Sequence, residues 1–164
     1  MTEIIWRRAT AADLSRIVEI YNQAVIHGIA TDDDKQQTVA SRQRWFNSFD
    51  NHHPLWVIEK GGQVVGWVGL PTFWPHPNFS QSAEISLYID NHFQHQHLGT
   101  TTLHFIDRQA PQLGIKTIVA YIYERNQPSQ QLFKQNDYHY AGELTNISHI
   151  RGEFRSLETY LKNF

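Results

Sequence analysis

Apolar residues recur along the chain with two different periods, and together these periods predict a mixed α/β fold. Over residues 14–25 the apolar positions lie three and four apart, which is the spacing of a helix with one buried face. Over residues 83–89, AEISLYI, apolar and polar positions alternate, which is typical of a half-buried strand. Thr10 and Asp13 precede the first helix at the spacing of a capping box, so we expect that helix to begin there. The apolar face of this helix consists of Leu14, Ile17, Val18, Tyr21 and Val25.

Turn residues separate the remaining elements. Gly61 and Gly62 lie between two runs rich in β-branched and aromatic residues, and they predict a hairpin over residues 55–70. Asn126 can cap a helix that has Pro128 in its first turn, where a missing N–H group costs little. The expected strands are 4–8, the two arms of the hairpin, 83–89, 117–123, 138–147 and 153–161, and the expected helices are 14–25, 38–49, 100–113 and 126–136. This order predicts a mixed, mostly antiparallel sheet of about seven strands flanked by about four helices.

Composition and charge narrow the class of protein. The chain has 164 residues, of which 40% are hydrophobic, so we expect one domain over residues 1–164. The formal net charge is −2 and no basic stripe is present, so nucleic acid is not an expected partner. We expect neither a signal peptide nor a membrane span, because no apolar run is long enough. The absence of cysteine excludes disulfides, thiolate metal sites and a cysteine nucleophile, and it fits a cytoplasmic protein.

The segment FQHQHLGTTT, residues 93–102, lies between an expected strand and an expected helix. A helix start leaves backbone N–H groups unpaired and carries a partial positive charge, so this turn is a candidate anion site. Two other interpretations stay open from these residues alone. The segment can be a solvated loop without a ligand, or His92, His95 and His97 can bind a metal. No thiolate and no HExxH spacing supports a metal, and we expect none.

Six segments of the chain resemble the GCN5-related N-acetyltransferases and, within that superfamily, the phosphinothricin and methionine sulfoximine acetyltransferases. In chain order they are RRATAADLSRIVEIYNQAV, RQRWF, VVGWVGL, AEISLYID, HLGTTTLHFI and NQPSQQLFKQNDY, so the resemblance spans nearly the whole chain. The resemblance implies a fold in which strands four and five splay apart, with acetyl-CoA in the gap between them. It also implies the function, which is acetyl transfer from acetyl-CoA to the primary amine of a small molecule.

In this family the turn after strand four binds the pyrophosphate and reads Gln or Arg, two residues, Gly, one residue, then Gly or Ala. The corresponding stretch here is Gln94-His95-Gln96-His97-Leu98-Gly99, in which His97 replaces a glycine. The replacement either tilts the turn or lets the imidazole itself donate to a phosphate. The cofactor-binding residues that the resemblance implies are Leu87, Tyr88, Ile89, Gln94, His95, Gln96, His97, Leu98, Gly99, Thr100, Asn126 and Ser129.

Glu84 matches the position of the family's catalytic glutamate, which takes a proton from the amine directly or through water. From strand alternation alone, an outward surface glutamate explains this residue equally well. Besides His97, two positions depart from the family pattern. Phe133 stands where relatives have a tyrosine or histidine that can protonate the leaving thiolate, and Asp137 stands where a glycine is usual. The sequence therefore does not identify the acid that protonates the thiolate.

The family binds the acid groups of its acceptors with arginines from the loop between strands three and four. Here that loop, FWPHPNFSQS, contains no arginine, and Phe73, Trp74 and His76 are the expected substrate-binding residues. A less acidic or more aromatic amine would suit these side chains. The acidic run Asp32-Asp33-Asp34 either attracts a cationic amine or is simply a solvated loop. The resemblance also implies a homodimer with the pocket near its interface.

Two other functions compete with a small-molecule N-acetyltransferase. The first is a CoA-binding module without turnover, which His97, Phe133 and the missing arginines favour. The second is an acetyltransferase that modifies proteins, which needs an open groove that the proline-rich loop disfavours. The sequence identifies neither the acceptor amine nor the oligomeric state.

Overall fold

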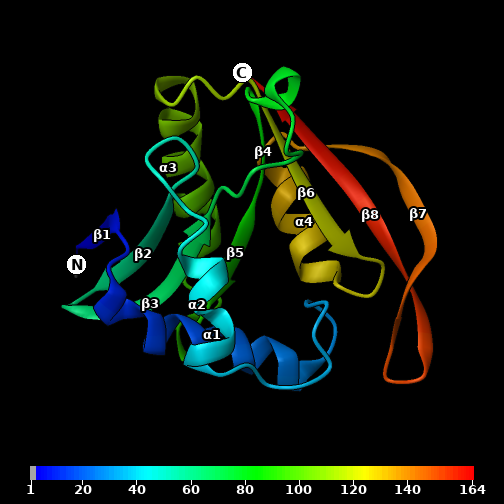
Figure 1. The fold of residues 1–164 in the computed structure, drawn as a ribbon, viewed down its shortest axis with the longest axis horizontal. Helices are drawn as coiled ribbons and strands as arrows, with labels where there is room; N and C mark the ends of the chain where they lie inside the picture. The colour runs from blue at the N-terminus through cyan, green and yellow to red at the C-terminus, as the bar shows by residue number, and fades with distance from the viewer. Residues whose placement is uncertain (1–2) are drawn as a thin grey trace.

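The computed structural model describes residues 3–164 and divides their strands between two sheets of four strands each (Figure 1). In the first sheet, all neighbouring strands are antiparallel, and the order is β1 (Ile4–Arg8), β2 (Leu55–Lys60), β3 (Gln63–Gly69) and β5 (Ser86–Ile89). In the second sheet the order is β4 (Ser82–Glu84), β6 (Thr117–Tyr123), β8 (Glu153–Asn163) and β7 (His139–Ile150). The β4–β6 pair is parallel and the other pairs of this sheet are antiparallel.

β4 and β5 are consecutive parts of one extended segment that changes sheets at Ile85. Glu84 pairs with Val119 of β6, whereas Ser86 pairs with Gly69 of β3. The single strand predicted over residues 83–89 is therefore wrong in one respect, since the structure splits it in two. The alternation of apolar and polar residues continues across the break because it records which side chains are buried, not which strand provides the hydrogen bonds.

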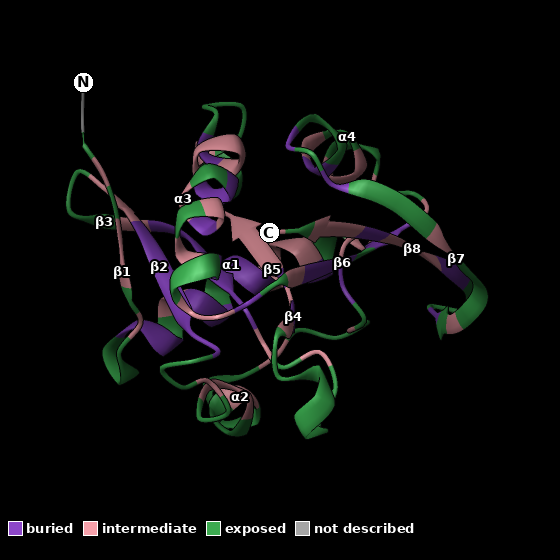
Figure 2. Cartoon of the chain, turned by 90° about the horizontal axis from the view of Figure 1, so that it is seen from above, coloured by how far each residue is buried: buried purple, intermediate pink, exposed green. Residues whose placement is uncertain are grey.

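Helices cover both faces of the strands (Figure 2). α1 (Leu14–His27) and α2 (Val39–Phe46) pack with one face of the first sheet, which presents Leu55, Val57 and Trp67 to them. α3 (Leu98–Gln112) and α4 (Gln127–Gln135) pack on the opposite side, in the core cluster that contains Trp56 and Val68. Successive residues of β2 thus face opposite layers, as the pleat of a strand requires. Short 3₁₀ turns occupy Ala11–Asp13, Pro77–Phe79 and Asn91–Phe93.

Most of the predicted elements are confirmed. Strands 4–8 and 117–123 agree with the structure at both ends, and all five apolar residues of the first helix are buried. The hairpin glycines take φ values of 61° and 77°. Several other boundaries differ by one to three residues. The helix expected over 100–113 begins at Leu98, the helix expected over 38–49 ends at Phe46, and the strands expected over 138–147 and 153–161 continue to Ile150 and Asn163. Within residues 3–164, no helix combines the length and the apolar character that crossing a bilayer requires.

Candidate active site

The two sheets separate where β4 ends and β5 begins. The last hydrogen bond toward β6 runs from the Ile85 N–H to the Val119 C=O (3.0 Å). Beyond it, β5 pairs with β3 on one edge, and its other edge and the facing edge of β6 have no strand partner among the described residues. Figure 1 shows β5 and β6 diverging from this point. The segment of β4 and β5 corresponds to strand four of the family and β6 to strand five, so the predicted splay is confirmed. Unpaired edges offer N–H and C=O groups to an extended ligand.

The turn after β5 enters α3 with its backbone N–H groups free. His95 and His97 have φ values of 58° and 60°, in the left-handed region, and His97 is the residue that precedes the helix. Over residues 94–100, no backbone N–H group donates to an acceptor in the part of the chain that the structure describes. A row of free N–H groups at a helix start suits an anion such as a pyrophosphate.

Asp90, which follows the last residue of β5, anchors this turn. Its side chain is 3% exposed and accepts hydrogen bonds from Arg16, from Gln23 (3.1 Å) and from the backbone N–H of His92 (2.8 Å). Burial alone would raise the pKa of this carboxyl, but the hydrogen bonds from His92, Gln23 and Arg16 outweigh burial and lower the pKa to about 2. An ionised carboxylate therefore joins α1 to the start of the turn.

Two contacts complete the surroundings of the turn. Gly99 lies against α4, and a Cβ at this position would come within 2.8 Å of Leu132 Cδ2. Lys60, at the end of β2, donates to the side-chain oxygen of Gln96 (2.5 Å) and brings a positive charge to the turn. The sequence analysis missed Lys60, because nothing in the hairpin pattern indicates that this lysine lies beside a turn 36 residues later.

Glu84 is the last residue of β4, at the point of separation. Ala83 and Ile85 are buried in the core, so the Glu84 side chain points to the opposite face, as the alternation predicts. Burial first, and then the charge of Asp32, raise the pKa of this carboxyl to about 7. Its oxygens accept no hydrogen bond from any residue between 3 and 164. A half-buried carboxylate that exchanges its proton near neutral pH has the properties of a general acid–base group.

The loop between α1 and α2 is held over this face by its acidic residues. Asp32 accepts a hydrogen bond from the Tyr123 hydroxyl of β6 (2.6 Å). Asp33 accepts from the Tyr21 hydroxyl (2.6 Å) and from the Arg42 guanidinium (2.8 Å). The acidic run is therefore more than a solvated loop. The sequence alone could not decide between a solvated loop and a site for a cationic amine. The partner of Asp32 is the hydroxyl of Tyr123, which is 91 residues away in the chain.

A comparison with known protein families shows the family to which the chain belongs. Residues 14–138 match the model of the Acetyltransferase (GNAT) family. The chain belongs to this family. The residues that the match spans include both open strand edges, Glu84 and the turn before α3.

Individual relatives agree with the GNAT assignment. The Bacillus subtilis protein YwnH, provisionally named a phosphinothricin acetyltransferase, is 32% identical over 148 residues, which cover 90% of this chain and 91% of that protein. An L-methionine sulfoximine/L-methionine sulfone acetyltransferase of Pseudomonas aeruginosa is 27% identical over 153 residues, which cover 92% of this chain and 89% of that protein. The structure of YncA from Salmonella typhimurium with its cofactor acetyl-CoA has a TM-score of 0.88 at 25% identity, over 98% of this chain and 93% of that chain. The GNAT protein described here is an acetyl-CoA-dependent N-acetyltransferase.

Three GNAT positions on α4 and next to its ends have structural roles in this chain. The Asn126 side chain accepts a hydrogen bond from the Ser129 N–H (3.3 Å) and so caps the helix, as predicted. Phe133 is 6% exposed and packs edge-on against Tyr138, with 4.9 Å between the ring centroids. Asp137 takes the left-handed conformation, with φ of 67°, that its glycine-like position requires. Phe133 therefore belongs to the core and carries no group that can protonate a thiolate.

The residues expected to bind the acceptor form a small cluster of their own in this GNAT protein. Phe73 and His76 both contact the ring of Phe79, at centroid distances of 6.0 Å and 6.2 Å, and Trp74 is 59% exposed. Their loop begins next to Glu84, since the Glu84 N–H donates to the Pro71 C=O (2.9 Å). No hydrogen bond, ion pair or ring contact joins the cluster to the Glu84 carboxylate within residues 3–164. Their role in binding the acceptor stays a prediction.

Proposed function

We propose that Glu84 is the catalytic base of this N-acetyltransferase and that the acceptor is a small molecule resembling an amino acid. The observation that carries this proposal is the state of the Glu84 carboxyl, which has a pKa of about 7 and no hydrogen-bond donor among the described residues. The names of the relatives support the acceptor class, since methionine sulfoximine and methionine sulfone are amino acids.

The cofactor fits the free backbone groups of the site. The N–H groups of residues 94–100 would hold the pyrophosphate, with Lys60 nearby to offset its charge. The open edge of β5, at Leu87, Tyr88 and Ile89, would pair with the pantetheine arm. Asn126 and Ser129 lie at the start of α4, across the gap between the strands. When bound there, acetyl-CoA supplies the acetyl thioester.

The residues of the chain would then carry out the proton transfers. An amine arrives as an ammonium ion, and Asp32 beside Glu84 favours its binding by charge. Glu84 takes the proton, so that the neutral nitrogen can form the new N–C bond as the C–S bond breaks. A backbone N–H of β5 would polarise the acetyl carbonyl. The nitrogen loses its second proton as the amide forms, and water can pass this proton to the thiolate, because Phe133 has no proton to give.

One observation favours a second candidate, a CoA-binding protein with little turnover. Phe133 replaces the residue that protonates the thiolate in relatives, and its ring is buried in the core. Such a protein would keep the free N–H groups of the turn while losing part of the chemistry. If this second candidate is correct, replacement of Glu84 would leave the low rate of thiol release unchanged.

We also propose that the protein acts as a homodimer. The ribbon formed by β7 and β8 extends away from the rest of the molecule (Figure 1) and carries four exposed apolar side chains. They are Tyr140, Leu144, Ile147 and Phe154. Large apolar side chains exposed on a projecting ribbon suit a protein–protein contact. Analytical ultracentrifugation of the protein and of an Ile147→Lys, Phe154→Lys variant tests this proposal, and a monomeric parent protein would refute it.

Release of free thiol from acetyl-CoA in the presence of an amine library tests the proposed function. We expect turnover with amino acids such as L-methionine sulfone, and near-background rates for Glu84→Gln. Glu143→Gln is the matched control, because Glu143 is an exposed residue of β7. If no amine gives thiol release while calorimetry still detects CoA binding, the second candidate replaces the first.

A further inference from the structure

Tyr121 leaves an aromatic ring exposed in the middle of β6. The neighbouring residues at alternate positions, Ile118, Ala120 and Ile122, belong to the core cluster that α3 and α4 cover. Tyr121 therefore points to the other face of the sheet, where it is 38% exposed. A single exposed ring is ordinary on a protein surface, so its meaning depends on what lies beside it.

The register of the strands places this ring next to the proposed catalytic base. Glu84 of β4 pairs with Val119 of β6, and both side chains lie on the same face as Tyr121. Tyr121 is two residues further along β6, and diagonal neighbours on one face of a sheet are about 7–8 Å apart, within reach of an aromatic side chain. Burial first, and then the charge of Glu84, raise the pKa of the Tyr121 hydroxyl, which agrees with this short separation.

The strand that would lie opposite Tyr121 has left this sheet. The chain changes sheets after Glu84, and Ser86 pairs with Gly69 of β3 instead of with β6. The gap in which the acetyl group would lie therefore opens between Ser86 on one side and Tyr121 on the other. An acceptor that presents its amine to Glu84 over this gap has the ring of Tyr121 beside it.

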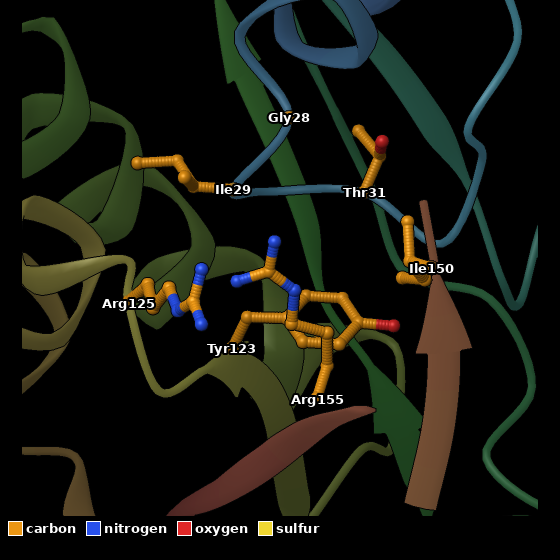
Figure 3. Close-up of a pocket in the computed structure, with 7 residues that line it drawn as sticks. All are labelled: Gly28, Ile29, Thr31, Tyr123, Arg125, Ile150 and Arg155. Atoms are coloured by element: carbon orange, nitrogen blue, oxygen red, sulfur yellow. The ribbon is translucent and has the colours of Figure 1, made fainter. Parts of the chain in front are cut away.

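The segment after α1 closes the far end of this space. The Tyr88 hydroxyl of β5 donates to the Ala30 C=O (3.1 Å), and the Tyr123 hydroxyl of β6 donates to Asp32 (2.6 Å), so the segment crosses from one strand to the other. The pocket that Tyr123 lines together with this segment has a volume of about 10 Å³, which is room for about one water (Figure 3). An acceptor thus cannot extend along β6 past Tyr123, and its side chain would lie against Tyr121.

We propose that Tyr121 determines acceptor specificity, because its ring packs against the side chain of an amino-acid acceptor and favours apolar side chains of moderate length over short ones. This inference rests on the proposed function and deepens it. Methylene groups that cover the ring leave water, and so does the ring itself, which stabilises the complex.

The Tyr121 hydroxyl is not needed for this role. It makes no hydrogen bond within residues 3–164, whereas the hydroxyls of Tyr88 and Tyr123, on the same face, both do. Its raised pKa also makes it a weaker acid, which disfavours a part in proton transfer. The ring is therefore the part of Tyr121 that the acceptor would contact.

The test compares L-norleucine with L-alanine, which share the amine and the acid group and differ in the length of an apolar side chain. We expect the parent protein to have the higher kcat/KM for L-norleucine. Tyr121→Ala should lower this kcat/KM at least about tenfold, the usual effect of a lost apolar contact on selectivity. The kcat/KM for L-alanine and the KM for acetyl-CoA should stay within about twofold. Tyr121→Phe keeps the ring and should behave as the parent protein with both acceptors.

Ile5→Ala is the matched control. Ile5 is 46% exposed on β1, and β2 and β3 lie between it and β5, so this variant should change neither acceptor. Tyr121→Thr covers the case in which the alanine variant does not fold, because threonine suits a strand and is too short to replace the ring.

Equal losses for L-norleucine and L-alanine in Tyr121→Ala would overturn the inference, and so would a parent protein that does not prefer L-norleucine. A loss of kcat for both acceptors in Tyr121→Phe would also overturn it and would assign the hydroxyl a part in proton transfer. Calorimetry of L-norleucine with the protein and CoA gives a readout without turnover. If the parent protein acetylates no amino acid, the proposed acceptor class fails. Binding of L-norleucine that Tyr121→Ala weakens and Ile5→Ala preserves would then still support the contact, and no binding to the parent protein would overturn it.

Discussion

Two acidic residues of one extended segment, Glu84 and Asp90, meet opposite conditions although both are removed from solvent. Burial raises the pKa of Glu84 to about 7, because no donor compensates for the lost water. Burial also acts against the ionised form of Asp90, but its hydrogen bonds reverse the effect and lower the pKa to about 2. The comparison shows that donors, rather than depth, decide whether a buried carboxylate holds the fold together or is ready to accept a proton.

The comparison also separates two regions of the site. Asp90 belongs to the side that would bind the cofactor, where α1, β5 and the turn before α3 are fixed to one another. Glu84 belongs to the side that would bind the acceptor, where a carboxylate is left unpaired near Asp32. A rigid cofactor side and a chemically unsatisfied acceptor side are what a transferase needs, since one substrate is positioned and the other is activated.

Replacing Glu84 should have the largest effect on activity. We expect Glu84→Gln to lower kcat by about 10²- to 10⁴-fold, the usual contribution of a general base. The same variant should be at least as stable as the parent protein at pH 8. A carboxyl whose pKa is raised in the folded state destabilises the fold once it ionises, so stability falls as the pH rises from about 4.5 to about 7. Thiol release and thermal unfolding at pH 4.5 and pH 8 measure both effects, and a variant that is clearly less stable at pH 8 would contradict this account.

Replacing Asp90 should give the opposite result, a loss of stability. We expect Asp90→Asn to lower the free energy of unfolding by about 2–4 kcal/mol at pH 7, because Arg16 loses a buried ionic partner. The pKa of Asp90 is lowered in the folded state, so its contribution is present above pH 4 and is lost as the pH falls toward 2. Urea unfolding at pH 7 and pH 3 should therefore show a smaller difference at the lower pH. Asp137→Asn is the control, since Asp137 is 92% exposed.

Much of this comparison is visible in the sequence, but its decisive part is not. The alternation around Glu84 and the capping residues Thr10 and Asn126 predict the elements correctly, because these signals are local. The bonds of Asp90 to α1 reach residues 74 and 67 positions away. The split of the strand at Ile85 depends on the pairing of Glu84 with Val119 and of Ser86 with Gly69, and no local pattern records such pairings. The same holds for the hydrogen bond between Asp32 and Tyr123. The resemblance to a family suggested Glu84 as the catalytic residue, which stays a prediction, and the structure supplies the physical reason for its raised pKa.

The pH dependence of the reaction tests whether the ionised form of Glu84 is the active one. We expect kcat/KM for the acceptor to rise with pH around an apparent pKa of about 7, because only the ionised carboxylate takes a proton. Asp32→Asn should move this limb to lower pH, since it removes the second cause of the raised pKa. Burial, the larger cause, remains, so the limb should stay above the ordinary pKa of a glutamate. Asp34→Asn, in the same loop, is the control, and an equal displacement by both variants would show that the net charge of the loop is responsible.

The smallest expected effect lies on the cofactor side, at His97. This residue has a φ of 60°, which glycine adopts without the strain that a side chain carries. We expect His97→Gly to raise the free energy of unfolding by roughly 0.5–1 kcal/mol and to leave the KM for acetyl-CoA within about threefold. The reason is that the free backbone N–H groups of residues 94–100, and not the imidazole, face the anion in this account. Asp137→Gly relieves a similar φ of 67° away from the turn and should gain stability without any change in KM. A large rise in KM confined to His97→Gly would show instead that the imidazole donates to a phosphate, and the cofactor side would then depend on a side chain just as the acceptor side does.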